Sequence, residues 1–215
     1  MDATAFVQVA TQIADGLCGP HERLRVQLLR LLAAGHPVAS EALAEALGWP
    51  AAAVAAVVSS CSDTEFDDAG RVVGWGLTLK PTAHQFRLGK TTLHTWCALD
   101  TLMYPTILAQ PADVTSSCPV TGTRVQLRAC PDGIADFQPA AAVVSIALPE
   151  EAPCSCSRAT FCAHGHYFAS SDAAEAWRGS APPSYILPVA TAAELARRIA
   201  SERLRRAALP TAPEH

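Results

Sequence analysis

The segment TWCALDTLMYP, residues 95–105, places a thiol near a carboxylate in a mostly apolar stretch. We expect a helix from about Thr91 to Met103 that ends before Pro105. Cys97 and Asp100 are three residues apart, close to one helical turn, so both side chains would project from the same face. A thiolate can bind a soft metal or act as a nucleophile, and a carboxyl group beside it can move a proton. The pair is therefore a candidate for chemistry.

A second candidate lies in FCAHGHYFAS, residues 161–170. If this stretch is a strand, Cys162, His164 and His166 share one face, and a Cys-His-His cluster suggests zinc. Structural zinc sites, however, use two ligand pairs with C-x2–4-C spacing, and the nearest pair here, the CSC of residues 154–156, is too close. Structural zinc is thus the weaker interpretation, and a plain buried thiol remains an alternative for each cysteine.

Composition limits the compartment and the class of partner. The chain has 215 residues, 50% hydrophobic and 17% charged, with a net charge of −4. It can bury a core, and it offers no broad attraction to nucleic acid or anionic membranes. No apolar run approaches the ~18–20 residues of a membrane span. The opening MDATAFVQVATQIADG lacks the basic region of a secretory signal. We therefore expect a cytoplasmic protein with no membrane partner.

Eight cysteines occur in the chain. A disulfide framework belongs to short secreted chains, and this chain has enough core-forming residues to fold without one. In a reducing cytoplasm we expect thiols, some buried and inert, others available as metal ligands or nucleophiles. They are Cys18, Cys61, Cys97, Cys118, Cys130, Cys154, Cys156 and Cys162.

The elements that must position these groups fall into two parts, and their order indicates an α+β fold. Residues 1–80 are predicted to form a winged-helix-like domain. Apolar residues recur at helical spacing over 21–35, a second helix is expected over 40–48, and a third runs from Pro50 through Ser59. TEFDDAGRVVGWGLTL then has the pattern of a hairpin.

Residues 81–215 are predicted to form the catalytic domain, a mixture of antiparallel strands and helices. ADVTSSCPVTGTRVQLRACPDG indicates a hairpin that turns at Thr121-Gly122, and AAAVVSIALP indicates a buried strand. TAAELARRIASERLRRAAL is predicted to be a terminal amphipathic helix. Its arginines are expected to form a solvated face that alternates with Glu194 and Glu202. These arginines are Arg197, Arg198, Arg203, Arg205 and Arg206.

The winged-helix pattern raises the question of DNA binding, and the charges argue against it. From Leu31 to Gly70 there is no Lys or Arg, and there are six acidic residues. A recognition helix must neutralise phosphates and present donors to base edges. The candidate helix here, PAAAVAAVVSS, offers neither, so we expect a packing domain that does not bind nucleic acid.

TWCALDTLMYP together with TFCAHGHYFAS resembles the organomercurial (alkylmercury) lyase family. The resemblance covers most of the chain and includes SSCPVTG, AVVSIALPEEA and FCAHGHYFASSDAAEAW. It implies that Cys97, Asp100 and Cys162 form the catalytic set and that Cys118 supports structure. Two features depart from the family pattern. Ala163 stands where family members carry a second cysteine, and APCSCSRAT looks like an insertion that carries two accessory thiols, Cys154 and Cys156.

The chemistry of mercury fits these residue types. Thiolates are the preferred ligands of soft Hg(II), and two thiolates on a carbon-bound mercury push electron density toward the carbon. A carboxylic acid beside the thiol can take a proton from an incoming thiol and return it to the carbon. Burial in an apolar pocket would raise the pKa of Asp100 from the ordinary ~3.9, as this role requires. Candidates for the pocket wall are Leu93, Trp96, Leu99 and Met103.

The resemblance implies protonolysis of R–Hg⁺ to a hydrocarbon and Hg(II), with the product held by Cys97 and Cys162, and by Asp100. No organic cofactor and no resident metal are expected, since mercury is substrate and product. External thiols are needed for turnover, and a mercuric reductase is the expected acceptor of Hg(II). Two alternatives remain open. One is a winged-helix regulator that responds to soft metals, and the other is a non-catalytic soft-metal carrier that would not need Asp100.

Overall fold

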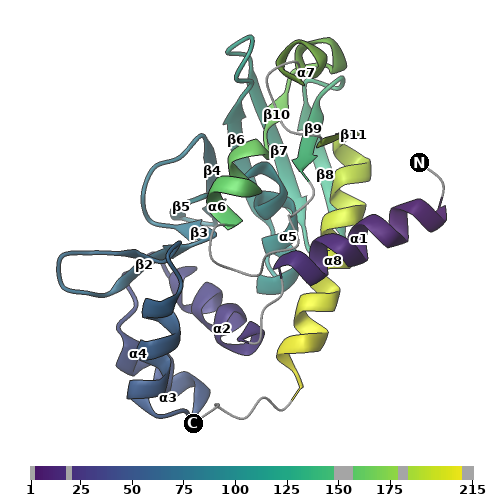
Figure 1. Ribbon diagram of the computed structural model, residues 1–215. Coiled ribbons are helices and arrows are strands. Elements are labelled where there is room, and N and C mark those ends of the chain that lie inside the picture. Colours follow the sequence, from purple (N-terminus) through teal and green to yellow (C-terminus); the bar gives the residue numbers. More distant parts are fainter. Residues whose placement is uncertain (1–2, 18–20, 148–156, 179–183, 210–215) are drawn as a thin grey trace.

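The structure is a computed structural model (Figure 1). Cys18, Cys154 and Cys156 lie outside the residues that it describes. The described residues are 3–17, 21–147, 157–178 and 184–209.

Four helices and a short hairpin form the N-terminal part. The turn after the third helix is closed by Gly48, whose φ of 68° lies in the left-handed region that favours glycine. The winged-helix-like order of helices followed by a hairpin is confirmed. The helices are α1 (Ala3–Leu17), α2 (Glu22–Leu32), α3 (Ser40–Leu47) and α4 (Ala51–Ser60), and the hairpin strands are β1 (Glu65–Phe66) and β2 (Val72–Trp75).

An eight-stranded antiparallel sheet has the strand order β1-β2-β3-β5-β4-β6-β7-β8. Its strands come from both sides of the predicted domain boundary at residue 80, so both parts of the chain contribute to it. A second antiparallel sheet has the order β10-β9-β11. The α+β class is confirmed. The remaining strands are β3 (Leu77–Thr78), β4 (His84–Leu88), β5 (Thr91–Thr95), β6 (Ala112–Ser117), β7 (Arg124–Cys130), β8 (Gly133–Gln138), β9 (Val143–Ala147), β10 (Tyr167–Phe168) and β11 (Ser184–Pro188).

Helix α5 (Ala98–Leu108) is buried almost all round, between the large sheet and α8 (Val189–Ala207). Helix α1 lies across α8 (Figure 1). The shorter helical pieces are α6 (Ser157–Thr160), η1 (Cys162–His164) and α7 (Ser171–Arg178). A helix that is apolar on every side belongs in a core. Residues placed at its N-terminus are therefore removed from water.

Among the described helices, none alone has the length and apolar composition to cross a membrane. The pair α3 and α4 reaches that length and composition together, but the two helices are bent by 117°. Leu43 and Val54, one from each helix, are completely buried in the protein core.

Two sequence predictions around the candidate residues are wrong. Thr91–Thr95 is strand β5, because its β-branched residues pair with β3 and β4, and the helix begins at Ala98 instead. The helix also continues through Pro105 to Leu108, since packing on all sides outweighs the lost hydrogen bond.

The predicted strand over FCAHGHYFAS is also wrong for most of its length. Cys162–His164 forms the 3₁₀ turn η1, and only Tyr167–Phe168 pairs as a strand. Cys162, His164 and His166 therefore do not share a strand face. Within the described part of the chain, the one group of three side chains placed to hold a metal is Cys97, Asp100 and Cys162.

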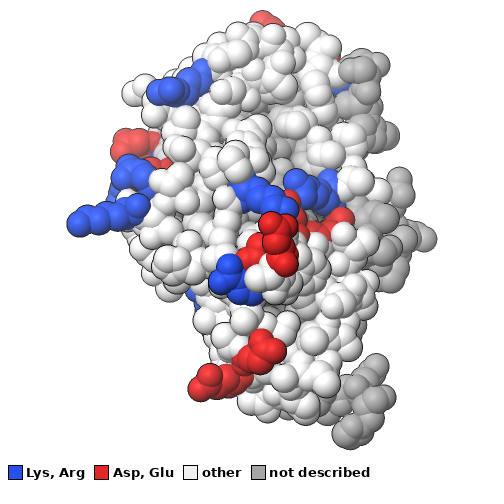
Figure 2. All heavy atoms as spheres, turned by 90° about the vertical axis from the view of Figure 1, so that its left-hand side faces the viewer, with Lys and Arg blue, Asp and Glu red and all other residues white. Residues whose placement is uncertain are grey.

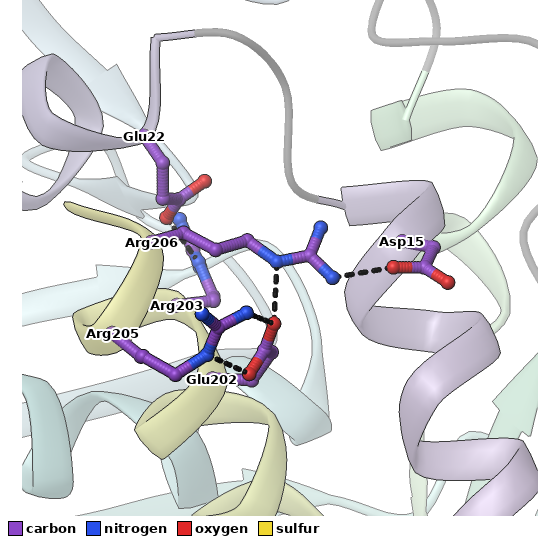
Figure 3. A network of polar contacts seen from close by, with 6 residues as sticks. All are labelled: Asp15, Glu22, Glu202, Arg203, Arg205 and Arg206. Atoms are coloured by element: carbon purple, nitrogen blue, oxygen red, sulfur yellow. Dashed lines mark hydrogen bonds and ion pairs between the residues drawn. The ribbon is translucent and has the colours of Figure 1, made fainter. Parts of the chain in front are cut away.

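The predicted solvated face of the last helix is wrong at one position. Arg203 is only 8% exposed, because it lies one turn after the buried Ile199 and faces the core. Its Nε donates to Oε1 of Glu22 at 2.5 Å. Figure 3 shows this pair beside a more exposed network in which Arg206 bonds both Glu202 and Asp15. Helix α8 is thus tied to both α1 and α2.

Candidate active site

The three predicted residues come together at the N-terminus of α5. The thiol sulfurs of Cys97 and Cys162 and a carboxylate oxygen of Asp100 all lie within 4.8 Å of one another. All three side chains are buried. Cys97 is the N-cap residue of α5, with extended φ and ψ of −143° and 168°, and Asp100 lies in the first helical turn. The spacing of three residues therefore works as predicted, although Cys97 precedes the helix.

Cys162 reaches this point because the turn that carries it docks on the start of α5. The backbone N–H of Ala98 donates to the carbonyl oxygen of Gly165 at 2.9 Å. A Cβ atom at Gly165 would lie only 2.8 Å from Cβ of Cys97, closer than real Cβ atoms pack. Glycine at this position lets the second thiol segment approach the first.

Polar side chains from the strands fix the same turn. The Ser145 hydroxyl on β9 donates to the His164 carbonyl at 2.7 Å and accepts from the backbone N–H of His166 at 3.0 Å. The Tyr167 hydroxyl lies 2.7 Å from Oγ1 of Thr101 on α5. The turn is therefore held both to the small sheet and to the helix.

His84 on β4 supports the turn from the large sheet. Its Nδ1 lies 2.9 Å from the Ser116 hydroxyl, and its ring also bonds the backbone of Gly165. Burial, followed by the charge of His166, lowers the pKa of His84 to about 3, so the ring is neutral. Sequence reasoning missed His84, Ser145 and Tyr167, because an isolated polar residue in a strand gives no signal of what it will face.

Burial governs the electrostatics of the three groups. Burial raises the pKa of Cys97 well above its ordinary value, with the hydrogen bond to Cys162 as the second cause. At Cys162 the hydrogen bond from Cys97 lowers the pKa, but burial and the charge of Asp100 outweigh it. Burial also raises the pKa of Asp100, against the hydrogen bonds from Cys97 and Tyr104. Burial therefore opposes the charged form of each of the three groups.

Oδ2 of Asp100 is buried and has no hydrogen-bond partner among the residues that the structure describes. Asp100 and Cys162 line a cavity of about 40 Å³. An unpartnered carboxyl oxygen costs free energy in a folded protein and is consistent with a group reserved for a ligand or a proton. Of the four predicted wall residues, Trp96 lines this cavity, and the other three are buried in the core.

The N-terminal part closes one side of the cavity. Arg25 and Leu29 come from α2, Trp75 is the last residue of β2, and Gly76 follows it. Gly76 has a φ of +83°, and a Cβ there would collide with the Tyr104 hydroxyl.

Arg158 links strand β1 to Trp96, the residue before Cys97. Its guanidinium lies 4.9 Å from the centre of the Trp96 ring, and it pairs with Glu65 at 2.5 Å. The two parts of the chain therefore build the site together.

Cys118 lies away from the three groups. It is 1% exposed and packs in a small cluster with Val143 and Phe168. Burial raises its pKa, but hydrogen bonds from Thr121 and from the backbone of neighbouring residues outweigh this and lower it. Its structural role stays a prediction. The roles of the accessory thiols Cys154 and Cys156 also stay predictions, because these residues lie outside the described ones.

Comparison with known proteins gives consistent matches along the chain. Residues 77–201 match the family model of alkylmercury lyase, and residues 8–76 match that of the helix-turn-helix domain of alkylmercury lyase. The chain is 40% identical to an alkylmercury lyase of Pseudomonas putida over 209 residues, which are 95% of this chain and 96% of that protein. It is 46% identical to one of Streptomyces lividans over 170 residues, 79% and 78% of the two chains.

Among solved structures, the mercury-bound form of MerB2 has a similar fold. The TM-score is 0.72 at 22% identity, with 93% of this chain and 99% of that one covered.

Gly165→Ala tests whether close docking of the turn sets the distance between the two thiols. The added methyl would push the Cys162 turn away from Cys97, and a displacement of ~1 Å can cost ~100-fold at a reacting centre. We expect Cd²⁺, a soft ion that both thiols can bind, to bind at least ~10-fold more weakly. Thiolate-to-metal charge-transfer absorption measures the affinity for Cd²⁺. Ala163→Ser, an exposed change in the same turn, is the control and should bind normally. Equal affinities in both variants would contradict the assigned role of Gly165.

Proposed function

The chain belongs to the alkylmercury lyase family and is an organomercurial lyase, and we propose that it breaks the carbon–mercury bond by protonolysis at Cys97, Asp100 and Cys162. The observation that carries this proposal is the convergence of two thiols and one carboxyl group within 4.8 Å, all buried. Thiolates are preferred ligands of mercury, and a carboxyl group can deliver the proton that the carbon must receive.

The proposed reaction balances as follows. The organomercurial arrives as RHg–SR′. One cysteine thiol replaces R′S and gives it a proton, which releases R′SH. The second thiol binds the same mercury and passes its proton to the Asp100 side chain, which enters this step as the carboxylate. The carbon then takes this proton as the Hg–C electron pair leaves mercury, which gives RH and Hg(II) on two thiolates. Mercury acidifies a thiol that binds it, and burial raises the pKa of Asp100, so the two proton affinities approach each other.

The proposal includes the fate of the product. Hg(II) remains on Cys97 and Cys162, with Asp100 nearby, until an external thiol pair removes it. Cellular thiols would supply R′S and complete turnover, and a mercuric reductase in the cytoplasm would be the final acceptor. The reaction as written needs no organic cofactor and no resident metal, because the thiols, the carboxyl group and the substrate supply every bond that changes.

Replacement of either thiol tests the proposal. Cys97→Ala and Cys162→Ala should each abolish benzene release from a phenylmercury salt in excess thiol, because one thiolate alone does not activate the Hg–C bond sufficiently. Gas chromatography measures the benzene, and circular dichroism checks that the fold is retained. Cys130→Ala, at the end of β7, is the matched control and should keep activity. Near wild-type benzene release by a folded Cys97→Ala or Cys162→Ala variant would remove that thiol from the mechanism.

Asp100→Asn separates binding from cleavage. The amide keeps the size and polarity of the side chain but cannot shuttle a proton, so single-turnover cleavage should slow by at least ~100-fold. Phenylmercury should still bind to the thiols, which distinguishes a lyase from a carrier. Asp113→Asn, in a surface ion-pair cluster on β6, should cleave normally. If Asp100→Asn cleaves as fast as the wild type, the proton comes from another group.

The regulator alternative depends on DNA binding, and we infer that this protein binds no nucleic acid. Helix α4 carries no Lys or Arg, and its valines Val54 and Val58 are buried. On the face in Figure 2, basic side chains are separated by uncharged surface and lie beside acidic ones. Such a surface cannot neutralise a run of phosphates. The full chain should pass through a heparin column at low salt without being retained. Salt-sensitive retention would contradict this inference and support the regulator alternative.

A further inference from the structure

Tyr104 lies one helical turn after Asp100 on α5, and both residues line the cavity beside the thiols. A separation of four residues places the two side chains on one face of the helix. The hydroxyl of Tyr104 forms a hydrogen bond with the Asp100 carboxyl group. Oδ2 of Asp100 has no partner in the described portions of the chain, so this bond is made to Oδ1. One carboxyl oxygen is therefore held, and the other is left to receive a proton.

The Tyr104 hydroxyl keeps its own proton and acts as a donor. The side chain is buried, and burial raises its pKa well above the ordinary value, with the charge of Asp100 as the second cause. A phenol that holds its proton this firmly is a poor general acid near neutral pH. Tyr104 therefore suits the orientation of the Asp100 carboxyl group and does not suit proton transfer to carbon.

Gly76, from the N-terminal part, limits where this hydroxyl can lie. Its lack of a side chain leaves room for the Tyr104 hydroxyl, which approaches so closely that a Cβ at Gly76 would occupy the same space. The carbonyl oxygen of Gly76 accepts from the backbone N–H of Trp96 at 2.9 Å, so Gly76 is tied to the residue before Cys97. The Tyr104 ring also packs edge-to-face with that of Phe86, with centroids 6.4 Å apart. The hydroxyl is therefore confined beside the carboxyl group.

We propose that Tyr104 is a positioning residue, whose hydroxyl holds Oδ1 of Asp100 and keeps the carboxyl group beside the two thiols, and that Gly76 provides the space for this hydroxyl. The proposal rests on the proposed function, because it concerns the group that carries the proton. It also gives the N-terminal part a role beyond closing the cavity, since a residue of that part determines how the acid is held.

Tyr104→Phe tests the role of the hydroxyl, because it removes that group and keeps the ring. Single-turnover benzene release at saturating phenylmercury measures cleavage. Tryptophan fluorescence in an Asp100→Asn background measures phenylmercury affinity. We expect cleavage to slow by about tenfold or more, as for the loss of a hydrogen bond to a charged group, with the affinity unchanged.

Tyr185→Phe is the matched control, because Tyr185 lies on β11, is 37% exposed and does not line the cavity. It should match the wild type in both measurements. Wild-type cleavage by Tyr104→Phe would overturn the proposal. A loss of affinity as large as the loss of rate would also overturn it, because the hydroxyl would then act on binding and not on the acid.

Gly76→Ala tests the space that Gly76 provides. The methyl group would displace the hydroxyl, so cleavage should slow when Tyr104 is present. In a Tyr104→Phe background the nearest ring carbon would lie 3.3 Å from the methyl carbon, and the same change should slow cleavage much less. Backbone strain from alanine at a φ of +83° is common to both backgrounds and cancels in the comparison. Slowing by the same factor in both backgrounds would overturn the role of Gly76.

A stability measurement keeps the test independent of turnover. Tyr104→Phe should lower the urea midpoint of unfolding in the wild type, and it should lower it less in an Asp100→Ala background, where the hydroxyl has already lost its acceptor. Equal shifts in the two backgrounds would overturn the proposed contact. Failure of the wild type to release benzene from phenylmercury would instead contradict the proposed function, and the urea comparison would then decide whether Tyr104 holds Asp100.

Discussion

The hydrogen bond from the Ala98 N–H to the Gly165 carbonyl joins the two segments on which the site depends. Cys97 and Cys162 are distant in the sequence, and both thiol sulfurs must lie within bonding distance of the same soft metal atom to bind it together. The bond fixes the end of the η1 turn against the first residue of α5, and the missing side chain of Gly165 allows the approach. The surrounding polar contacts, from Ser145 on one side and His84 on the other, orient the same short turn.

The N-terminal part is coupled to this centre by buried charge. Glu22 on α2 and Arg203 on α8 form a buried ion pair, and the second carboxylate oxygen of Glu22 is buried with no hydrogen-bond partner within the described part of the chain. Such a pair adds little net stability, since desolvation offsets attraction, but loss of one partner costs ~3–5 kcal/mol. We therefore infer that this ion pair positions the two helices and adds little to the stability of the fold. It fixes α2 against α8, and so places Arg25 and Leu29 over a cavity whose floor belongs to the other part of the chain.

Sequence reasoning proposed the Cys97–Asp100 pair from its residue types and spacing and Cys162 from the family resemblance, and the structure brings the three side chains together. The thiol and carboxyl group of the Cys97–Asp100 pair lie on one side of a helical turn even though the helix starts at Ala98 and not at about Thr91 as expected. Sequence reasoning failed where strand pairing and docking decide the structure. The threonines of β5 are strand formers that pair with the adjacent strand β4 and with β3, and η1 follows from docking on α5. Arg203 has the sequence pattern of a surface residue, and the ion pair with Glu22 from another helix compensates for its burial.

Burial of all three groups has a consequence for how the site discriminates among cations. With pKa values raised above their ordinary range, the two thiols hold their protons, so a hard cation finds no thiolate to attract it. A soft mercury atom can displace thiol protons, because the sulfur–mercury bonds compensate for the loss. In the proposed reaction one of these protons remains in the site on Asp100, next to the carbon that must accept it. The burial that suppresses adventitious cation binding therefore also retains the proton for bond cleavage.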